Sequence, residues 1–89
     1  MTLGPLADNV AHEYERAGLA LVLGGRPADA VDVFAKGIAR RPRVASFHLN
    51  RAVALAMAGR TGEARTEAQT ALGLDPGYEK AKELLRTIK

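Results

Sequence analysis

Apolar side chains recur at intervals of three and four residues along most of the chain, and this pattern indicates helices. Such spacing keeps apolar side chains on one face of a helix, whereas a half-buried strand would show strict alternation. The sequence supports no strand in any segment. Two segments show the helical spacing most clearly, at Val10, Tyr14, Ala17 and Leu21, and at Leu49, Ala52, Leu55 and Ala56.

Glycine and proline residues mark where these helices should end. A glycine can adopt the left-handed conformation that closes a helix, and a proline stops a helix because it lacks a backbone N–H. Pro27 suits the first turn of a helix, where that N–H is not needed. The expected helix ends are marked by Gly24-Gly25, Pro42, Gly59 and Pro76.

The apolar spacing, together with the positions of the glycines and prolines, predicts five helices. They are expected at about residues 6–24, 27–40, 44–58, 61–73 and 77–88. We expect Thr61 to be the N-cap of the fourth helix, because its hydroxyl can accept a backbone hydrogen bond there. Asp75 and Pro76 are expected to open the fifth helix.

A six-residue motif occurs twice, 34 residues apart: residues 25–30 read Gly-Arg-Pro-Ala-Asp-Ala, and residues 59–64 read Gly-Arg-Thr-Gly-Glu-Ala. Self-similarity at a period of about 20–50 residues predicts repeated units that stack to bury their apolar faces. The same offset aligns Gly18 with Ala52, Leu21 with Leu55, Gly37 with Ala71, Ile38 with Leu72 and Pro42 with Pro76.

Small residues fall where the helices of such a stack would touch. Aromatic residues make up only 4% of the chain although 47% is hydrophobic, so the core must be built from small side chains. Because two helix backbones approach closely only where side chains are short, we expect Gly18 to face Ala30, and Gly37 to contact the following helix. Their counterparts one period later are Ala52, Ala64 and Ala71.

With this period and these residues, the chain resembles the tetratricopeptide repeat family, whose unit is a 34-residue helix–turn–helix. The first repeat would be residues 11–44 and the second residues 45–78. The second departs from the pattern at His48, where an aromatic residue is expected and Phe47 lies beside it, and at Ala68, which replaces the large residue that Phe34 supplies. The matching residues are Tyr14, Gly18, Leu21, Ala30, Phe34, Gly37 and Pro42, and then Asn50, Ala52, Leu55, Gly59, Ala64, Ala71, Leu74, Asp75 and Pro76.

The resemblance implies an all-α fold in a single domain spanning residues 1–89. It would be a right-handed α-α superhelix of two helix–turn–helix units, followed by a C-terminal solvating helix. Residues 79–89 begin like a third repeat and stop after one helix. That capping helix would cover the apolar end of the stack with Ala81, Leu84, Leu85 and Ile88.

In this family the first helix of each pair lines a concave groove that receives a peptide or a partner helix. The resemblance therefore implies a non-enzymatic protein–protein interaction module with a protein or peptide partner. Much of the implied groove is apolar, and a contiguous exposed apolar patch usually marks an interaction site. The groove residues would be His12, Glu15, Arg16, Leu19, Val22, Leu23, Ser46, Leu49, Asn50, Val53, Ala56, Met57, Lys80, Glu83, Leu84 and Thr87.

One branch of the family holds the C-terminal carboxylate of heat-shock chaperones with five Lys, Asn and Arg residues. Asn50 and Lys80 match that pattern, whereas Glu15, Leu19 and Leu84 occupy the other three places. Glu15 would repel an anionic terminus, so the sequence disfavours this mode of binding. The alternative for Asn50 is a structural role in which it bonds backbone groups between the repeats.

The charge balance is only mildly basic: 13 Lys and Arg against 10 Asp and Glu give a net charge of +3. Arg40, Arg41 and Arg43 flank Pro42 at a helix C-terminus, where cations complement the helix dipole. Nucleic-acid binding would need more charge and an aromatic stacking platform. We therefore expect no nucleic-acid partner.

Targeting and membrane signals are not evident. The longest apolar stretch, residues 17–25, is far shorter than the roughly 20 residues that cross a bilayer. The first ten residues contain no Lys or Arg, which disfavours a signal peptide. We expect a cytoplasmic protein with no membrane partner, and the abundance of Ala, Arg and Gly favours a bacterial source.

Catalytic and metal-binding motifs are also not evident. The chain has no cysteine, and His12 and His48 lack the close spacing of metal ligands. Residues 18–25 hold glycines but no Gly-Lys-Ser/Thr sequence, so no phosphate loop is expected. We expect no catalytic residue, no metal and no cofactor.

Two alternatives to a groove for a foreign partner stay open at this point. The chain could self-associate into a homo-oligomer, because two repeats form only a small core and a second copy could cover the groove. It could also be an accessory subunit of a larger assembly. The sequence alone does not separate that last role from the interaction module.

Overall fold

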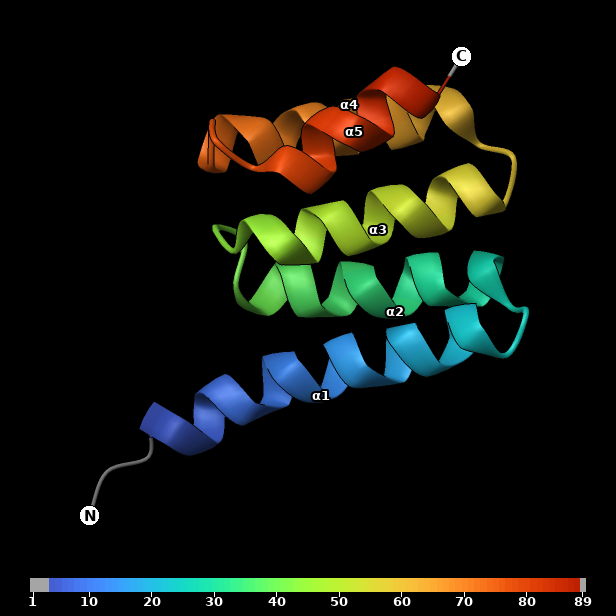
Figure 1. The fold of residues 1–89 in the computed structure, drawn as a ribbon. Coiled ribbons are helices and arrows are strands. Elements are labelled where there is room, and N and C mark those ends of the chain that lie inside the picture. Colours follow the sequence, from blue (N-terminus) through green and yellow to red (C-terminus); the bar gives the residue numbers. More distant parts are fainter. Residues whose placement is uncertain (1–3, 89) are drawn as a thin grey trace.

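Five α-helices build the fold over residues 4–88, the part of the chain that the computed structural model describes; side chains are described for residues 10–88. The helices are α1 (Gly4–Leu23), α2 (Pro27–Arg40), α3 (Ala45–Met57), α4 (Thr61–Leu74) and α5 (Glu79–Thr87). Figure 1 shows them stacked in chain order, with α1 at one end of the stack and α4 and α5 together at the other. Residues 4–88 contain no strand, so the expected all-α repeat fold is confirmed.

The repeated six-residue motif forms the same helix end twice. Gly25 and Gly59 have φ angles of +78° and +82°, the left-handed conformation that only glycine adopts without strain. The arginine N–H after each glycine donates to a carbonyl five residues earlier, over 2.8 Å in the first turn and 2.9 Å in the second. Both turns therefore close the preceding helix in the same way, with a left-handed glycine and a backbone hydrogen bond from the arginine that follows it.

The remaining positions of the motif begin the next helix. Arg26 pairs with Asp29 over 2.7 Å, and Arg60 pairs with Glu63 over 2.6 Å. Each arginine carbonyl also accepts a bond from the N–H of the final alanine, which is fully buried in both copies. The spacing that the two copies of the motif share thus reflects one structural solution used at two helix junctions.

Two expected helix starts are wrong. Thr61 is the first residue of α4 and not its N-cap; Arg60 occupies the cap position, without a side-chain capping bond. Asp75 is the C-cap of α4, and its carboxylate accepts a hydrogen bond from the Gly77 N–H over 3.3 Å. Because residues 75–78 form a turn in this way, α5 begins only at Glu79.

Fully buried alanines line the contacts between helices, as the composition predicted. The larger core cluster combines Ala30, Val31, Phe34, Ala54, Leu55, Ala64 and Ile88. A smaller cluster of Leu49, Ala71 and Ala81 joins α3, α4 and α5. In α5, Ala81 is buried and Leu84 and Leu85 are half-buried, and Ile88, the residue that follows the helix, is buried as well, so the expected inward residues are confirmed.

The nearest neighbour of Gly18 is the aromatic ring of Phe34 on α2, which the sequence had not identified as its partner. A Cβ on Gly18 would overlap the ring of Phe34, a residue that is only 2% exposed. One period later both partners differ, since Ala52 and Ala68 replace the glycine and the phenylalanine and both are fully buried. In the first repeat a glycine thus accommodates an aromatic ring. In the second, two alanines occupy the corresponding positions.

Gly37 lies between two helices. A Cβ there would contact Cβ of Tyr14 in α1 at 3.4 Å and Cδ2 of Phe47 in α3 at 3.9 Å. The expected contact with the following helix is therefore present, together with one to the preceding helix. This close approach holds α2 between α1 and α3.

A buried polar cluster joins α3 to α4. His48 Nδ1 lies 2.5 Å from Oε1 of Glu67, and its Nε2 lies 2.7 Å from the carbonyl oxygen of Pro42. The second carboxylate oxygen of Glu67 accepts a bond from Arg51 over 2.6 Å. His48, in the place of the expected aromatic residue, is therefore a packing histidine with a polar partner on each ring nitrogen.

Candidate functional site

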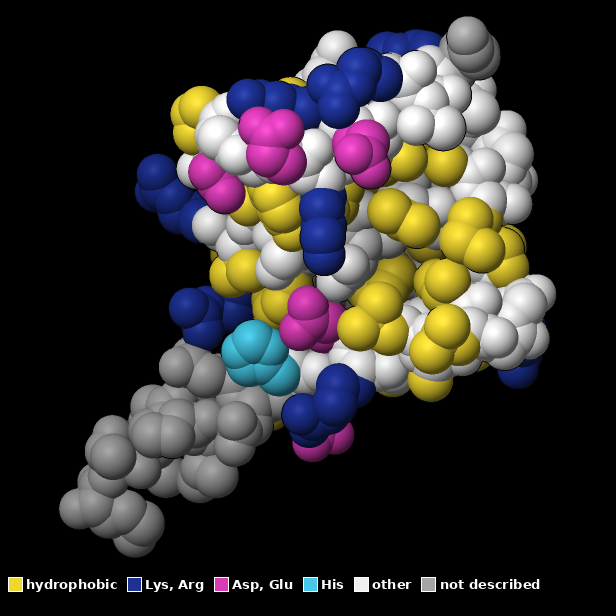
Figure 2. All heavy atoms as spheres, in the orientation of Figure 1, with side chains coloured by type: hydrophobic (Ala, Val, Ile, Leu, Met, Phe, Trp, Pro, Cys, Tyr) yellow, Lys and Arg dark blue, Asp and Glu magenta, His cyan; other side chains and the backbone are white. Residues whose placement is uncertain are grey.

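Helices α1, α3 and α5 share one face of the molecule. Helix α3 contacts both α1 and α5, and all three lie toward the viewer in Figure 1. The same view in Figure 2 shows hydrophobic side chains gathered on this face, toward the C-terminal ends of α1 and α3. The exposed large hydrophobic residues of the described part are Leu19, Leu23 and Met57, at 41%, 88% and 55%.

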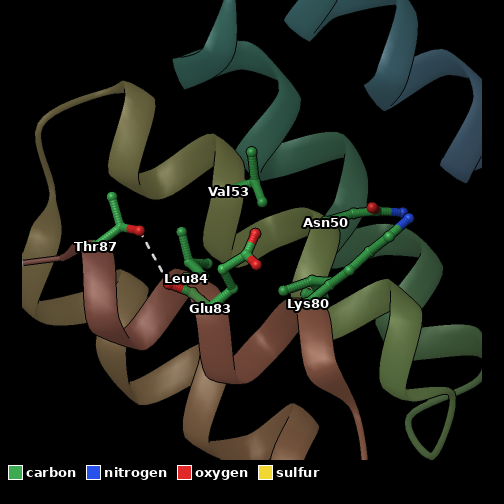
Figure 3. A pocket seen from close by; sticks show the side chains of 7 residues that line it. Asn50, Val53, Lys80, Glu83, Leu84 and Thr87 are labelled. Carbon is green, nitrogen blue, oxygen red and sulfur yellow. Dashed lines mark hydrogen bonds between the residues drawn. The ribbon is translucent and has the colours of Figure 1, made fainter.

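A hollow of about 310 Å³ opens between α3 and α5 on this face. Its base is apolar, since Leu49 is buried and Val53 and Leu84 are half-buried. Figure 3 shows Lys80, Glu83 and Thr87 along the α5 side and Asn50 and Val53 along the α3 side. The lining residues are Leu49, Asn50, Val53, Lys80, Glu83, Leu84 and Thr87, all of which the resemblance had implied.

Glu15 links the first helix pair to the second beside this hollow. Its Oε2 accepts a hydrogen bond from Nδ2 of Asn50 over 3.1 Å, and its Oε1 lies 3.3 Å from Nδ1 of His12. The His12 ring also packs edge-on against Phe47, with 5.8 Å between ring centroids. Asn50 does bond between the repeats as expected, but to a carboxylate and not to the backbone.

Charges around the hollow are largely uncompensated. Among the described residues, Glu15 pairs only with His12, and neither Lys80 nor Glu83 forms an ion pair. Burial raises the pKa of Tyr78 above its usual 10.0, and the negative charges of Asp75 and Glu15 raise it further. The charge of Glu15 on α1 therefore acts across the face as far as the residue that precedes α5.

The other implied groove residues lie outside the hollow. Val22 and Ala56 are half-buried and pack against the larger core cluster, so they contribute to the core as well as to the surface. Arg16 is exposed and pairs with Glu13 on its own helix over 3.0 Å. Ser46 is half-buried in the first turn of α3.

Sequence reasoning missed Tyr78 at this site. Its ring packs against the cluster of Leu49, Ala71 and Ala81 just before α5 begins. The repeat register gave no signal for it, because the residue 34 positions earlier is Val44.

Two further properties of the described residues bear on the site. Within residues 4–88 no helix is both long and apolar enough to span a bilayer. No three His, Asp or Glu side chains of that part lie close enough together to hold a metal ion.

The sequence matches the profile of a family described as tetratricopeptide repeat, over residues 15–79. A curated relative is the TPR repeat-containing thioredoxin TTL4 of Arabidopsis thaliana, with 32% identity over 78 residues. The alignment covers 88% of this chain but only 11% of that relative, so the chain spans a small part of its length.

Two solved structures have a similar fold. The Sgt2 TPR domain from Aspergillus fumigatus superposes with a TM-score of 0.84 and 24% identity, over 88% of this chain and 52% of the other. The second TPR of Spaghetti (RPAP3), bound to the HSP90 peptide SRMEEVD, gives a TM-score of 0.80 and 28% identity. That match covers 86% of this chain and 74% of the other.

Proposed function

Because the chain belongs to the tetratricopeptide repeat family, we propose that it binds a peptide segment of a partner protein on the face formed by α1, α3 and α5. It would act as a non-enzymatic protein–protein interaction module. We assign the first repeat to residues 11–44, the second to residues 45–78 and the capping helix to residues 79–89.

The observation that carries this proposal is the hollow together with the apolar surface beside it. Leu49, Val53 and Leu84 form the apolar base of the hollow. The exposed Met57 follows Val53 by one turn of α3, and the exposed Leu19 follows Glu15 by one turn of α1, so both continue the same helix faces. Exposed apolar surface of this kind is costly in water and usually marks an interaction site. The hollow is at the small end of the range for ligand pockets, which suits a side chain of a peptide.

The comparison with Spaghetti supports a peptide as the ligand. Its second TPR has 28% identity to this chain and is bound to the HSP90 peptide SRMEEVD. Since that likeness extends over 86% of this chain, binding of a linear segment is the simplest role for the same fold here. The identity of the segment is a separate matter, because partner choice depends on a few surface side chains.

A peptide selection followed by affinity measurements tests the proposal. Peptides of twelve residues would be selected from a displayed library on the immobilised chain, and their Kd values measured by fluorescence polarisation. The double variant Leu19→Glu/Met57→Glu is expected to weaken their binding by about tenfold or more, because it places charge in the apolar contact. The matched control is Ala39→Glu/Gln69→Glu, which adds the same charges at exposed positions of α2 and α4.

Retained affinity in the Leu19→Glu/Met57→Glu variant, with an unchanged circular dichroism spectrum, would show that the face is not the binding site. Self-association over the same apolar surface is the alternative role. Sedimentation equilibrium distinguishes the two, because a chain that stays monomeric at high concentration does not use this surface for a second copy. A dimer that the same double variant dissociates would support the alternative.

A further inference from the structure

We propose that the hollow selects a basic amphipathic segment, one that inserts an apolar side chain between α3 and α5 and places a Lys or Arg beside Glu15. This inference rests on the proposed function and specifies the chemistry of its ligand. It follows from the charges and the apolar groups that surround the hollow.

The apolar part of the ligand follows from the base of the hollow. Leu49, Val53 and Leu84 line it, and Leu19 and Met57 extend the apolar surface outside it. A leucine-sized side chain entering a space of about 310 Å³ would bury its surface against these groups. A second apolar residue one helical turn away would cover the exposed surface outside.

The basic part of the ligand follows from Glu15. Its side chain is 24% exposed, and within the described residues its hydrogen-bond partners are the amide of Asn50 and the ring of His12. A carboxylate accepts about four hydrogen bonds, so Glu15 retains acceptor sites for a cation. Its negative charge is also a cause of the raised pKa of Tyr78, after burial and Asp75.

The neighbouring charges leave an excess of carboxylates. Glu83 lines the hollow and is exposed, and Lys80 is the one Lys or Arg among the lining residues. Figure 3 shows the Lys80 and Asn50 side chains extending toward each other. The hollow and the adjoining Glu15 thus carry two carboxylates, Glu15 and Glu83, against the one ammonium of Lys80, and a ligand cation would balance the remaining charge.

Four synthetic peptides test this preference on the intact chain. Three share their apolar residues and differ only in charge: acetyl-KALLKALLKA-amide, acetyl-EALLEALLEA-amide and acetyl-QALLQALLQA-amide. The fourth is SRMEEVD, the peptide bound to the Spaghetti domain. The chain has a net charge of +3, so long-range attraction alone would favour the acidic probes. A preference for the basic probe therefore reports the charges around the hollow.

The basic probe is expected to bind about five- to twentyfold more tightly than the acidic one, and SRMEEVD is expected to bind more weakly than the basic probe. Glu15→Gln should reduce that preference by about two- to fivefold, since it removes the charge while its amide oxygen still accepts from Asn50. The matched control Glu13→Gln, two residues away and exposed, should leave it unchanged. If Glu15→Gln impairs folding, Glu83→Gln tests the same preference, because Glu83 lines the hollow and is exposed.

The inference is overturned if the acidic probe or SRMEEVD binds as tightly as the basic one, or if none of the probes binds at about 1 mM. It is also overturned if Glu15→Gln and Glu83→Gln leave the preference unchanged. These outcomes differ from failure of the proposed function, which the selected peptides and the Leu19→Glu/Met57→Glu variant test without regard to ligand charge.

Discussion

Replacing Gly18 by alanine is expected to destabilise the chain, although alanine is the better helix former. In the middle of a helix the exchange of glycine for alanine normally stabilises by about 0.5–1 kcal/mol. Here the new Cβ would overlap three carbons of the Phe34 ring, Cε1, Cδ1 and Cζ, the last at 2.7 Å. Real Cβ atoms do not approach so closely, so the ring must move.

The ring has little space in which to move. Phe34 is 2% exposed and belongs to the larger core cluster. Overpacking of a tight core costs about 1–3 kcal/mol, which exceeds the gain in helix propensity. We therefore expect Gly18→Ala to lower the free energy of unfolding by a net of about 1–2 kcal/mol. For a chain of 89 residues this corresponds to a fall of roughly 4–16 °C in Tm.

Urea unfolding followed by circular dichroism at 222 nm measures this effect. The matched control is Gly73→Ala in α4, where an added Cβ meets no atom within 4 Å and should not destabilise. The double variant Gly18→Ala/Phe34→Leu should lose less stability than the sum of the single variants, by about 1 kcal/mol or more, because the smaller side chain relieves the overlap. A Gly18→Ala variant as stable as the parent chain, or strictly additive losses, would refute the argument.

Two further predictions concern the polar groups. Glu67→Gln is expected to lower the free energy of unfolding by about 1–3 kcal/mol in urea titrations, because the buried His48 and the half-buried Arg51 lose their charged partner; a loss no larger than that of the exposed Glu63→Gln would contradict this. The raised pKa of Tyr78 means that the folded chain holds this proton more tightly than the unfolded chain, so stability is expected to fall as the pH rises above about 10.0. Unfolding at pH 9 to 11 should show a smaller fall for Tyr78→Phe, and an identical pH profile would contradict the prediction.

The helices and their order could be predicted from the sequence because local signals determine them. The left-handed glycines at positions 25 and 59 end their helices as expected. Pro27 begins α2 as expected. Thr61 failed as a cap because Arg60 takes that position and pairs with Glu63 instead. The N-cap and the first residue of a helix are neighbours in the sequence, and composition does not determine which of the two a given residue will be.

Side-chain partners could not be predicted, because they depend on how distant segments approach each other. Glu15 and Asn50 are 35 residues apart, and His48 and Glu67 are 19 apart. The repeat register aligns positions but does not say which side chains meet across an interface. The hollow was easier to predict, since its residues all lie on the first helices and the terminal helix that the resemblance implied.

The duplicated turn has a consequence for how the chain folds. Each copy closes between residues only five apart, and its arginine and acidic residue are three apart. Contacts this local form early, because closing a short loop costs little chain entropy. Either helix pair can therefore nucleate and the other can add to it, as in longer repeat arrays. A change that weakens one turn should speed unfolding of its own pair while refolding starts from the other.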